Sequence, residues 1–69
     1  MENLFELRSK NNDYIGKYKS DSPGFAVRTI LDNSANLHDY DQEIKLELID
    51  ENNYRVLTGG KEYLLTKIE

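Results

Sequence analysis

The sequence contains no cysteine, no tryptophan and only one proline among its 69 residues. The absence of cysteine excludes a disulfide framework, a cysteine-ligated metal and a thiol nucleophile. It also favours an intracellular location, because a small domain without disulfides needs no oxidising compartment. Apolar runs such as Phe25–Val27 extend over only three residues, whereas a membrane-spanning helix needs about 20. We therefore expect no membrane span, and the N-terminus has neither the basic start nor the apolar stretch of a signal peptide.

Positive charge is also in deficit, because 9 Lys and Arg stand against 13 Asp and Glu, which gives a net charge of −4. This deficit argues against a generally basic DNA-coating protein, since such binding depends on phosphate neutralisation. The length allows one modest core, because a chain near this size buries only about 60% of its unfolded surface. We expect a single domain over residues 1–69 without a deep active-site cleft.

Apolar residues recur with the period of a β-strand in five segments: residues 3–9, 14–18, 44–48, 54–58 and 61–68. The polar residues Lys10–Asp13 predict a turn that tolerates left-handed backbone. Gly59 and Gly60 are both free to adopt positive φ, which is typical of a two-residue hairpin. Gly16, inside the second segment, predicts a bulge or a close packing approach.

One helix is predicted between the second and third strands. Ser22 is a candidate N-cap, and Pro23 occupies the first helical position, where its missing N–H costs nothing. The helix ends near residues 32–34, and its apolar residues share one face: Ala26, Val27, Ile30 and Leu31. The predicted fold is therefore α+β, in the order ββαβββ, with one helix packed on an antiparallel sheet.

No catalytic set of residues is visible. His38 has three acidic neighbours, Asp39, Asp41 and Glu43. Such a group can form a metal or acid–base site, but a solvated loop is the interpretation we favour, because one His without a defined ligand spacing is weak evidence. Gly59-Gly60-Lys61 lacks the full spacing of a phosphate loop and leads into a strand, so a hairpin is favoured. We predict a protein that is not an enzyme and has neither a metal nor a cofactor.

The chain has five Tyr, of which four fall on predicted strands: Tyr14, Tyr18, Tyr54 and Tyr63. Exposed aromatic rings among basic residues can stack on nucleic-acid bases. Tyr is also a good strand residue that contributes to small cores. We favour core or rim positions for these rings and keep base stacking as the alternative.

Charge is unevenly distributed along the chain. Residues 8–28 hold five Lys and Arg against two Asp, whereas residues 32–51 hold seven acidic residues against one Lys. A basic surface can bind phosphates, and the candidate nucleic-acid-binding residues are Arg8, Lys10, Lys17, Lys19, Arg28, Arg55 and Lys61. If this hypothesis is right, four cationic side chains should converge on one face: Lys17, Lys19, Arg28 and Arg55.

The acidic stretch supports an alternative hypothesis, an interaction module or inhibitor that imitates the charge of DNA and docks on a basic partner protein. Its candidate residues are Asp39, Asp41, Glu43, Glu47, Asp50 and Glu51. Either hypothesis is compatible with a monomer or a homodimer, because an exposed edge strand can pair with a copy of itself.

Three motifs resemble the start of the archaeal chromosomal protein MC1 family and its viral relatives: Phe5-x-Leu7-Arg8, Gly16-x-Tyr18 and Ser22-Pro23-x-x-Ala26. Ile44-Lys45-Leu46 resembles the strand that follows the helix in that family. The resemblance implies a ββαβββ domain that binds and bends double-stranded DNA as a monomer, without catalysis. The content of Asn, Lys, Ile and Tyr is typical of an AT-rich genome and compatible with a viral source.

The chain departs from the MC1 pattern in its charge. The family is strongly basic and has a helix that bears Lys and Arg, whereas the predicted helix here has only Arg28, and no Trp matches the family's C-terminal DNA-contacting segment. Each missing phosphate contact removes part of the free energy of counterion release. The sequence therefore predicts that binding to double-stranded DNA is weak or absent.

Overall fold

A computed structural model describes residues 2–33 and 43–68 of the chain. Its elements follow the order β1 (Asn3–Ser9), β2 (Tyr14–Ser20), α1 (Pro23–Asn33), β3 (Ile44–Asp50), β4 (Asn53–Thr58) and β5 (Lys61–Lys67). The predicted α+β fold with the order ββαβββ is confirmed. The polar link around His38 lies outside the described residues.

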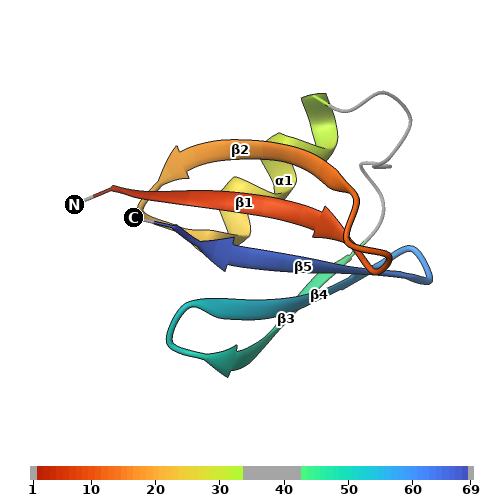
Figure 1. Cartoon of the computed structure of the whole chain (residues 1–69). Helices are drawn as coiled ribbons and strands as arrows, with labels where there is room; N and C mark the ends of the chain where they lie inside the picture. Colours follow the sequence, from red (N-terminus) through yellow and green to blue (C-terminus); the bar gives the residue numbers. More distant parts are fainter. Residues whose placement is uncertain (1, 34–42, 69) are drawn as a thin grey trace.

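The five strands form one antiparallel sheet in the order β2-β1-β5-β4-β3. The first and last strands are neighbours at the centre of the sheet, with Leu7 opposite Leu65. This pairing brings the two ends of the chain close together (Figure 1). Strands β2 and β3 form the two edges.

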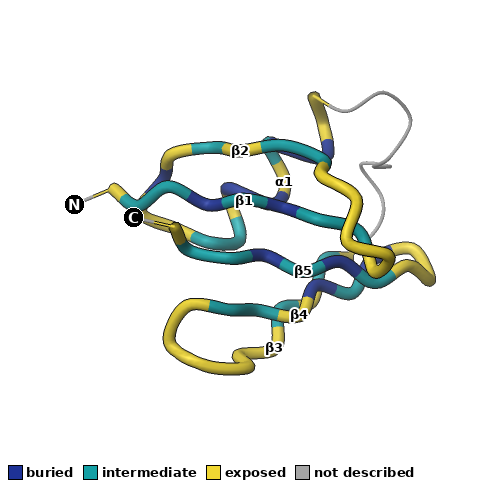
Figure 2. Tube along the Cα trace, in the orientation of Figure 1, coloured by how far each residue is buried: buried dark blue, intermediate teal, exposed yellow. Residues whose placement is uncertain are grey.

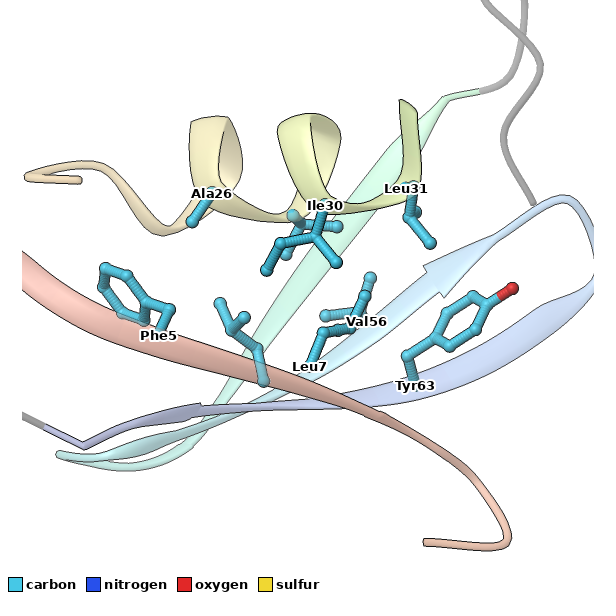
Figure 3. Packing of buried hydrophobic residues seen from close by; sticks show 9 residues of the cluster. Phe5, Leu7, Ala26, Ile30, Leu31, Val56 and Tyr63 are labelled. Atoms are coloured by element: carbon cyan, nitrogen blue, oxygen red, sulfur yellow. The ribbon is translucent and has the colours of Figure 1, made fainter. Parts of the chain in front are cut away.

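The helix covers one face of this sheet, and the core lies between the two layers. Residues directly opposite each other in an antiparallel pair point to the same face, so the register assigns each side chain to a face. Phe5, Leu7, Val56 and Leu65 lie on the helix side and are at most 2% exposed. The four apolar helix residues predicted to share a face are all buried against them (Figure 3).

The structure shows both features predicted for Gly16, a bulge and a close packing approach. Leu7 pairs with Gly16 and Arg8 pairs with Tyr14, so Ile15 is an extra residue that makes a bulge in β2. A Cβ at Gly16 would lie 2.9 Å from Cγ2 of Ile30, so the helix approaches the strand too closely for a larger residue.

The predicted turns and helix start are also confirmed. Asn12, Gly59 and Gly60 have φ of 71°, 57° and 75°, as expected for left-handed turn positions. The hydroxyl of Ser22 accepts a hydrogen bond from the N–H of Phe25 at 3.3 Å. Three strands are one or two residues longer than expected, because β2 continues to Ser20, β3 continues to Asp50 and β4 starts one residue earlier, while β5 ends one residue earlier.

Thr58 is a polar residue in an apolar setting, and replacing it should stabilise the fold. It is 5% exposed, and its Oγ1 has no hydrogen-bond partner among the described residues. We expect Thr58→Val to raise the free energy of unfolding by about 1 kcal/mol, because a buried hydroxyl without a partner is costly. Urea denaturation followed by circular dichroism measures the change.

Thr66→Val is the matched control for that substitution. The hydroxyl of Thr66 donates a hydrogen bond to Oδ1 of Asn53 at 3.0 Å. Its removal should lower the free energy of unfolding by about 0.5–1.5 kcal/mol. A lower urea midpoint for Thr58→Val would show that the Thr58 hydroxyl is satisfied in solution.

Candidate nucleic-acid interface

The face of the sheet away from α1, here called the open face, has a positive charge although the chain is acidic. The register assigns to it five cationic side chains, Arg8, Lys17, Lys19, Lys45 and Arg55. Four carboxylates share the face: Glu6, Glu47, Asp50 and Glu62. A net charge of −4 over the whole chain therefore coexists with a surplus of one positive charge on this face.

The two arginines of the open face are paired with three of its four carboxylates. Arg8 Nη2 lies 2.6 Å from Oε1 of Glu6. Arg55 lies 3.3 Å from Oε1 of Glu47 and 3.8 Å from Oε2 of Glu62. The positive surplus therefore resides on three lysines, none of which forms an ion pair within the part of the chain that the structure describes: Lys17, Lys19 and Lys45.

Two of these lysines lie with an aromatic ring at the β2 edge. Lys17 and Lys19 are two residues apart, so both point to the open face. Tyr14 is opposite Arg8 at the other end of β2 and is 55% exposed. We call the set of Arg8, Tyr14, Lys17 and Lys19 the β2 patch.

The seven predicted nucleic-acid-binding residues do not form a single surface. Arg28 is exposed on α1, in the layer opposite the open face, because burial of Ala26, Val27, Ile30 and Leu31 turns it to solvent. The expected convergence of all four side chains is therefore wrong: Lys17, Lys19 and Arg55 share the open face, but Arg28 does not. This outcome counts against a DNA interface formed by helix and sheet together. Lys61 is on the helix side of the sheet, opposite Thr58.

Two hollows border the open face near the β1–β2 turn. A cavity of about 240 Å³ is lined by Lys10, Ile49, Arg55 and Leu64, among others. A larger, open hollow of about 800 Å³ at the β4–β5 hairpin brings together three lysines: Lys10, Lys45 and Lys61. Glu43 and Glu62 also line it, so its charge is mixed.

The predicted acidic docking face is described only in part, because Asp39 and Asp41 lie outside the described residues. Two of its carboxylates are engaged locally. Glu47 pairs with Arg55, and Asp50 accepts hydrogen bonds from the N–H of Asn52 at 2.8 Å and from Nδ2 of Asn53 at 2.9 Å. These donors hold the pKa of the Asp50 carboxyl below its ordinary value of 3.8. Glu43 and Glu51 are exposed at opposite ends of β3.

The tyrosines divide between core and surface. Tyr63 is 5% exposed, and burial raises the pKa of its hydroxyl above the ordinary value of 10.0. Tyr18 and Tyr54 are partly buried against the core, and the Tyr18 ring lies 5.9 Å from that of Phe25. Core or rim positions are therefore confirmed for these three, whereas Tyr14 has a ring free to stack.

Lys45 is the open-face cation that the sequence hypothesis left out. The alternation of residues 44–48 placed it on the charged side of a strand. Its local segment is acidic, however, and only the register of β3 against β4 puts it on the same face as the cations of β2.

Within the described residues, no helix is long and apolar enough to cross a membrane.

Comparisons of the chain with family models, with curated proteins and with solved structures found no match. The resemblance to the MC1 family therefore stays a prediction. Function has to be argued from the geometry of the open face.

Proposed function

We propose that this protein is a small, non-enzymatic binding module that associates weakly with nucleic acid through the β2 patch. The observation that supports the proposal is that Lys17 and Lys19, which have no ion-pair partner among the described residues, share an edge strand with the exposed ring of Tyr14. Ammonium groups that have no carboxylate partner are available to replace the counterions of phosphates. An exposed ring next to them adds a stacking surface for a base.

The location of the patch favours a nucleic-acid strand that lies along β2. Figure 1 shows β2 at the margin of the sheet, on the far side from the β3–β4 hairpin. The acidic residues Asp50 and Glu51 are in that hairpin, at the opposite edge of the sheet. A polyanion at β2 therefore avoids them, as far as the described residues are concerned. The helix cation Arg28 has no part in this surface.

The size of the patch sets the expected affinity and its dependence on salt. With two phosphate contacts, from Lys17 and Lys19, raising the salt from about 50 to about 200 mM should weaken binding about 7- to 12-fold. The lower figure applies to a single strand and the higher one to a duplex. So few contacts predict weak binding, as the acidic composition does.

The test is a fluorescence anisotropy titration of a labelled 20-nucleotide single strand and a labelled duplex at both salt concentrations. We expect binding at about 50 mM salt and a loss of about 10-fold or more in the Lys17→Glu/Lys19→Glu variant, because two contacts become repulsive. A chain that binds neither probe at about 50 mM salt contradicts the proposal.

Arg28→Glu/Lys61→Glu is the matched control. It changes the net charge of the chain by the same amount as the β2 variant, but on side chains away from the open face. Its affinity should fall only about two- to threefold, through the long-range field. Equal losses of affinity in the two variants would show that binding depends only on the total charge of the chain. That result would contradict a specific role of the β2 patch.

The acidic interaction module remains the second hypothesis, with weaker support. Of its four described carboxylates, Glu47 and Asp50 already have partners within the chain. A basic partner would therefore meet mainly Glu43 and Glu51, which are separated by the length of β3.

A further inference from the structure

Strand β3 is a free edge of the described sheet and has exposed apolar side chains. It pairs only with β4 in the described sheet. Leu48 is 68% exposed and Ile49 54% exposed, and Figure 2 shows that this end of the sheet is largely exposed. The opposite edge carries Lys17 and Lys19, a common protection against pairing of strands between molecules. On β3 the lysine Lys45 alternates with Glu47, so the strand does not repel a copy of itself and can act as a template for another strand.

We propose that two copies of this chain pair antiparallel through β3, with Leu46 on the two-fold axis. In this register Lys45 lies opposite the partner's Glu47, and Glu47 opposite the partner's Lys45. Ile44 and Leu48 then lie opposite the partner's Leu48 and Ile44. The segment from Ile44 to Leu48 is therefore its own complement in both charge and apolarity, as an isologous interface requires.

The two faces of β3 support this register. Lys45 and Glu47 are on the open face, where their side chains are exposed, while Ile44, Leu46 and Leu48 are on the helix side. Pairing about Leu46 puts two Lys–Glu pairs on one face and covers Leu48 on the other. Such cross-strand pairs are what stabilises a sheet. The bulge between Leu48 and Asp50 limits the pairing to the regular part of the strand.

Other edge pairings are less complementary. Two β2 strands that meet antiparallel near their centre place Lys17 opposite a lysine of the second copy. A β2 strand against the β3 strand of another copy aligns Lys17 and Lys19 with Glu47 and Lys45, which gives one attractive and one repulsive pair. Only β3 against β3 pairs all its charges with opposite ones. Like charges directly opposite each other are destabilising.

Charge exchange on β3 tests the proposal, with the dissociation constant of the dimer measured by sedimentation equilibrium. Lys45→Glu places Glu opposite Glu twice in each dimer, so we expect dimerisation to weaken at least about tenfold. Glu47→Lys should do the same by placing Lys opposite Lys. A mixture of the two variants should form a heterodimer, because every pair in it is again attractive. Circular dichroism establishes that each variant is folded, since Glu47→Lys also loses the ion pair with Arg55.

Lys17→Glu is the control with the same charge change on the other edge of the sheet. It should leave the dissociation constant of the dimer unchanged, and a weaker dimer would point instead to pairing of β2 with β3. The proposal is also overturned if the unmodified chain stays monomeric at the highest concentration reached, or if Lys45→Glu dimerises as well as the unmodified chain. No nucleic acid is present in these measurements, so their outcome is independent of the β2 patch.

Discussion

Replacing Leu65 with alanine is expected to remove a large share of the protein's free energy of unfolding. Leu65 is fully buried on the central strand β5, opposite Leu7 on one side and Tyr54 on the other. Leu→Ala at such positions costs about 2–5 kcal/mol, through lost burial and the cavity left behind. A chain of 69 residues typically has a free energy of unfolding of about 3–10 kcal/mol. Urea denaturation followed by circular dichroism measures the loss.

Leu64→Ala is the matched control, because it removes the same atoms one residue away. Leu64 points to the open face between Arg8 and Arg55 and is only partly buried. We expect it to cost less than about 1 kcal/mol, since less apolar area returns to water. If the two alanine variants are equally stable, the core does not lie on the side of the sheet where Leu65 points.

Leu64 and Leu65 also show what the sequence could and could not predict. Two adjacent leucines within a strand must point to opposite faces, but alternation alone does not say which of them is buried. The helix decides, since it covers the face that holds Leu65. Patterns within a few residues of one another predicted every strand, the helix and the turns at Lys10–Asp13 and Gly59–Gly60 to within one or two residues.

The strand order was not accessible from those local patterns. Strands β1 and β5 pair across most of the length of the chain, and nothing in either segment specifies the other. This long-range pairing separates β2 from β3 and so makes them the two edges. Both proposed interfaces, the β2 patch and the β3 edge, depend on that arrangement.

The candidate site was predicted as a set of charged residues, and the fold places these residues on different surfaces of the protein. Arg28 and Lys17 are both in the basic stretch of the sequence, yet Arg28 is on the helix and Lys17 is on the open face of the sheet. Side chains repeat about every 3.6 residues along a helix and every two along a strand, so closeness in sequence does not place them on one surface. Ion pairing also could not be foreseen from composition. Arg8 and Arg55 are neutralised by neighbouring glutamates, so the charge available to a ligand resides on lysines.

Gly16→Ala is the second substitution with a large expected effect, although it adds only one methyl group. That methyl would lie 2.9 Å from Cγ2 of Ile30, well inside van der Waals contact. Relief requires the Ile30 side chain to shift or the helix to move away from β2, the strand on which it mainly packs. Overpacking of this kind costs about 1–3 kcal/mol, and the lower entropy of the unfolded alanine chain offsets at most about 1 kcal/mol of it. The net loss should be about 1–2 kcal/mol.

Gly24→Ala tests whether the contact with Ile30, rather than the loss of a glycine, causes that effect. A Cβ at Gly24 would meet only Leu46 Cδ1 at 3.8 Å and Ser22 Oγ at 3.9 Å, which are ordinary contacts. Gly24 is in the first turn of α1, so alanine should raise the free energy of unfolding by about 0.4–1 kcal/mol. The same chemical change is therefore expected to alter the free energy of unfolding in opposite directions at the two positions. Urea midpoints that move in the same direction would contradict the close packing of α1 on β2.

A double-mutant cycle with Ile30→Ala, which removes Cγ2, should recover most of the cost at Gly16, because the two residues are in contact.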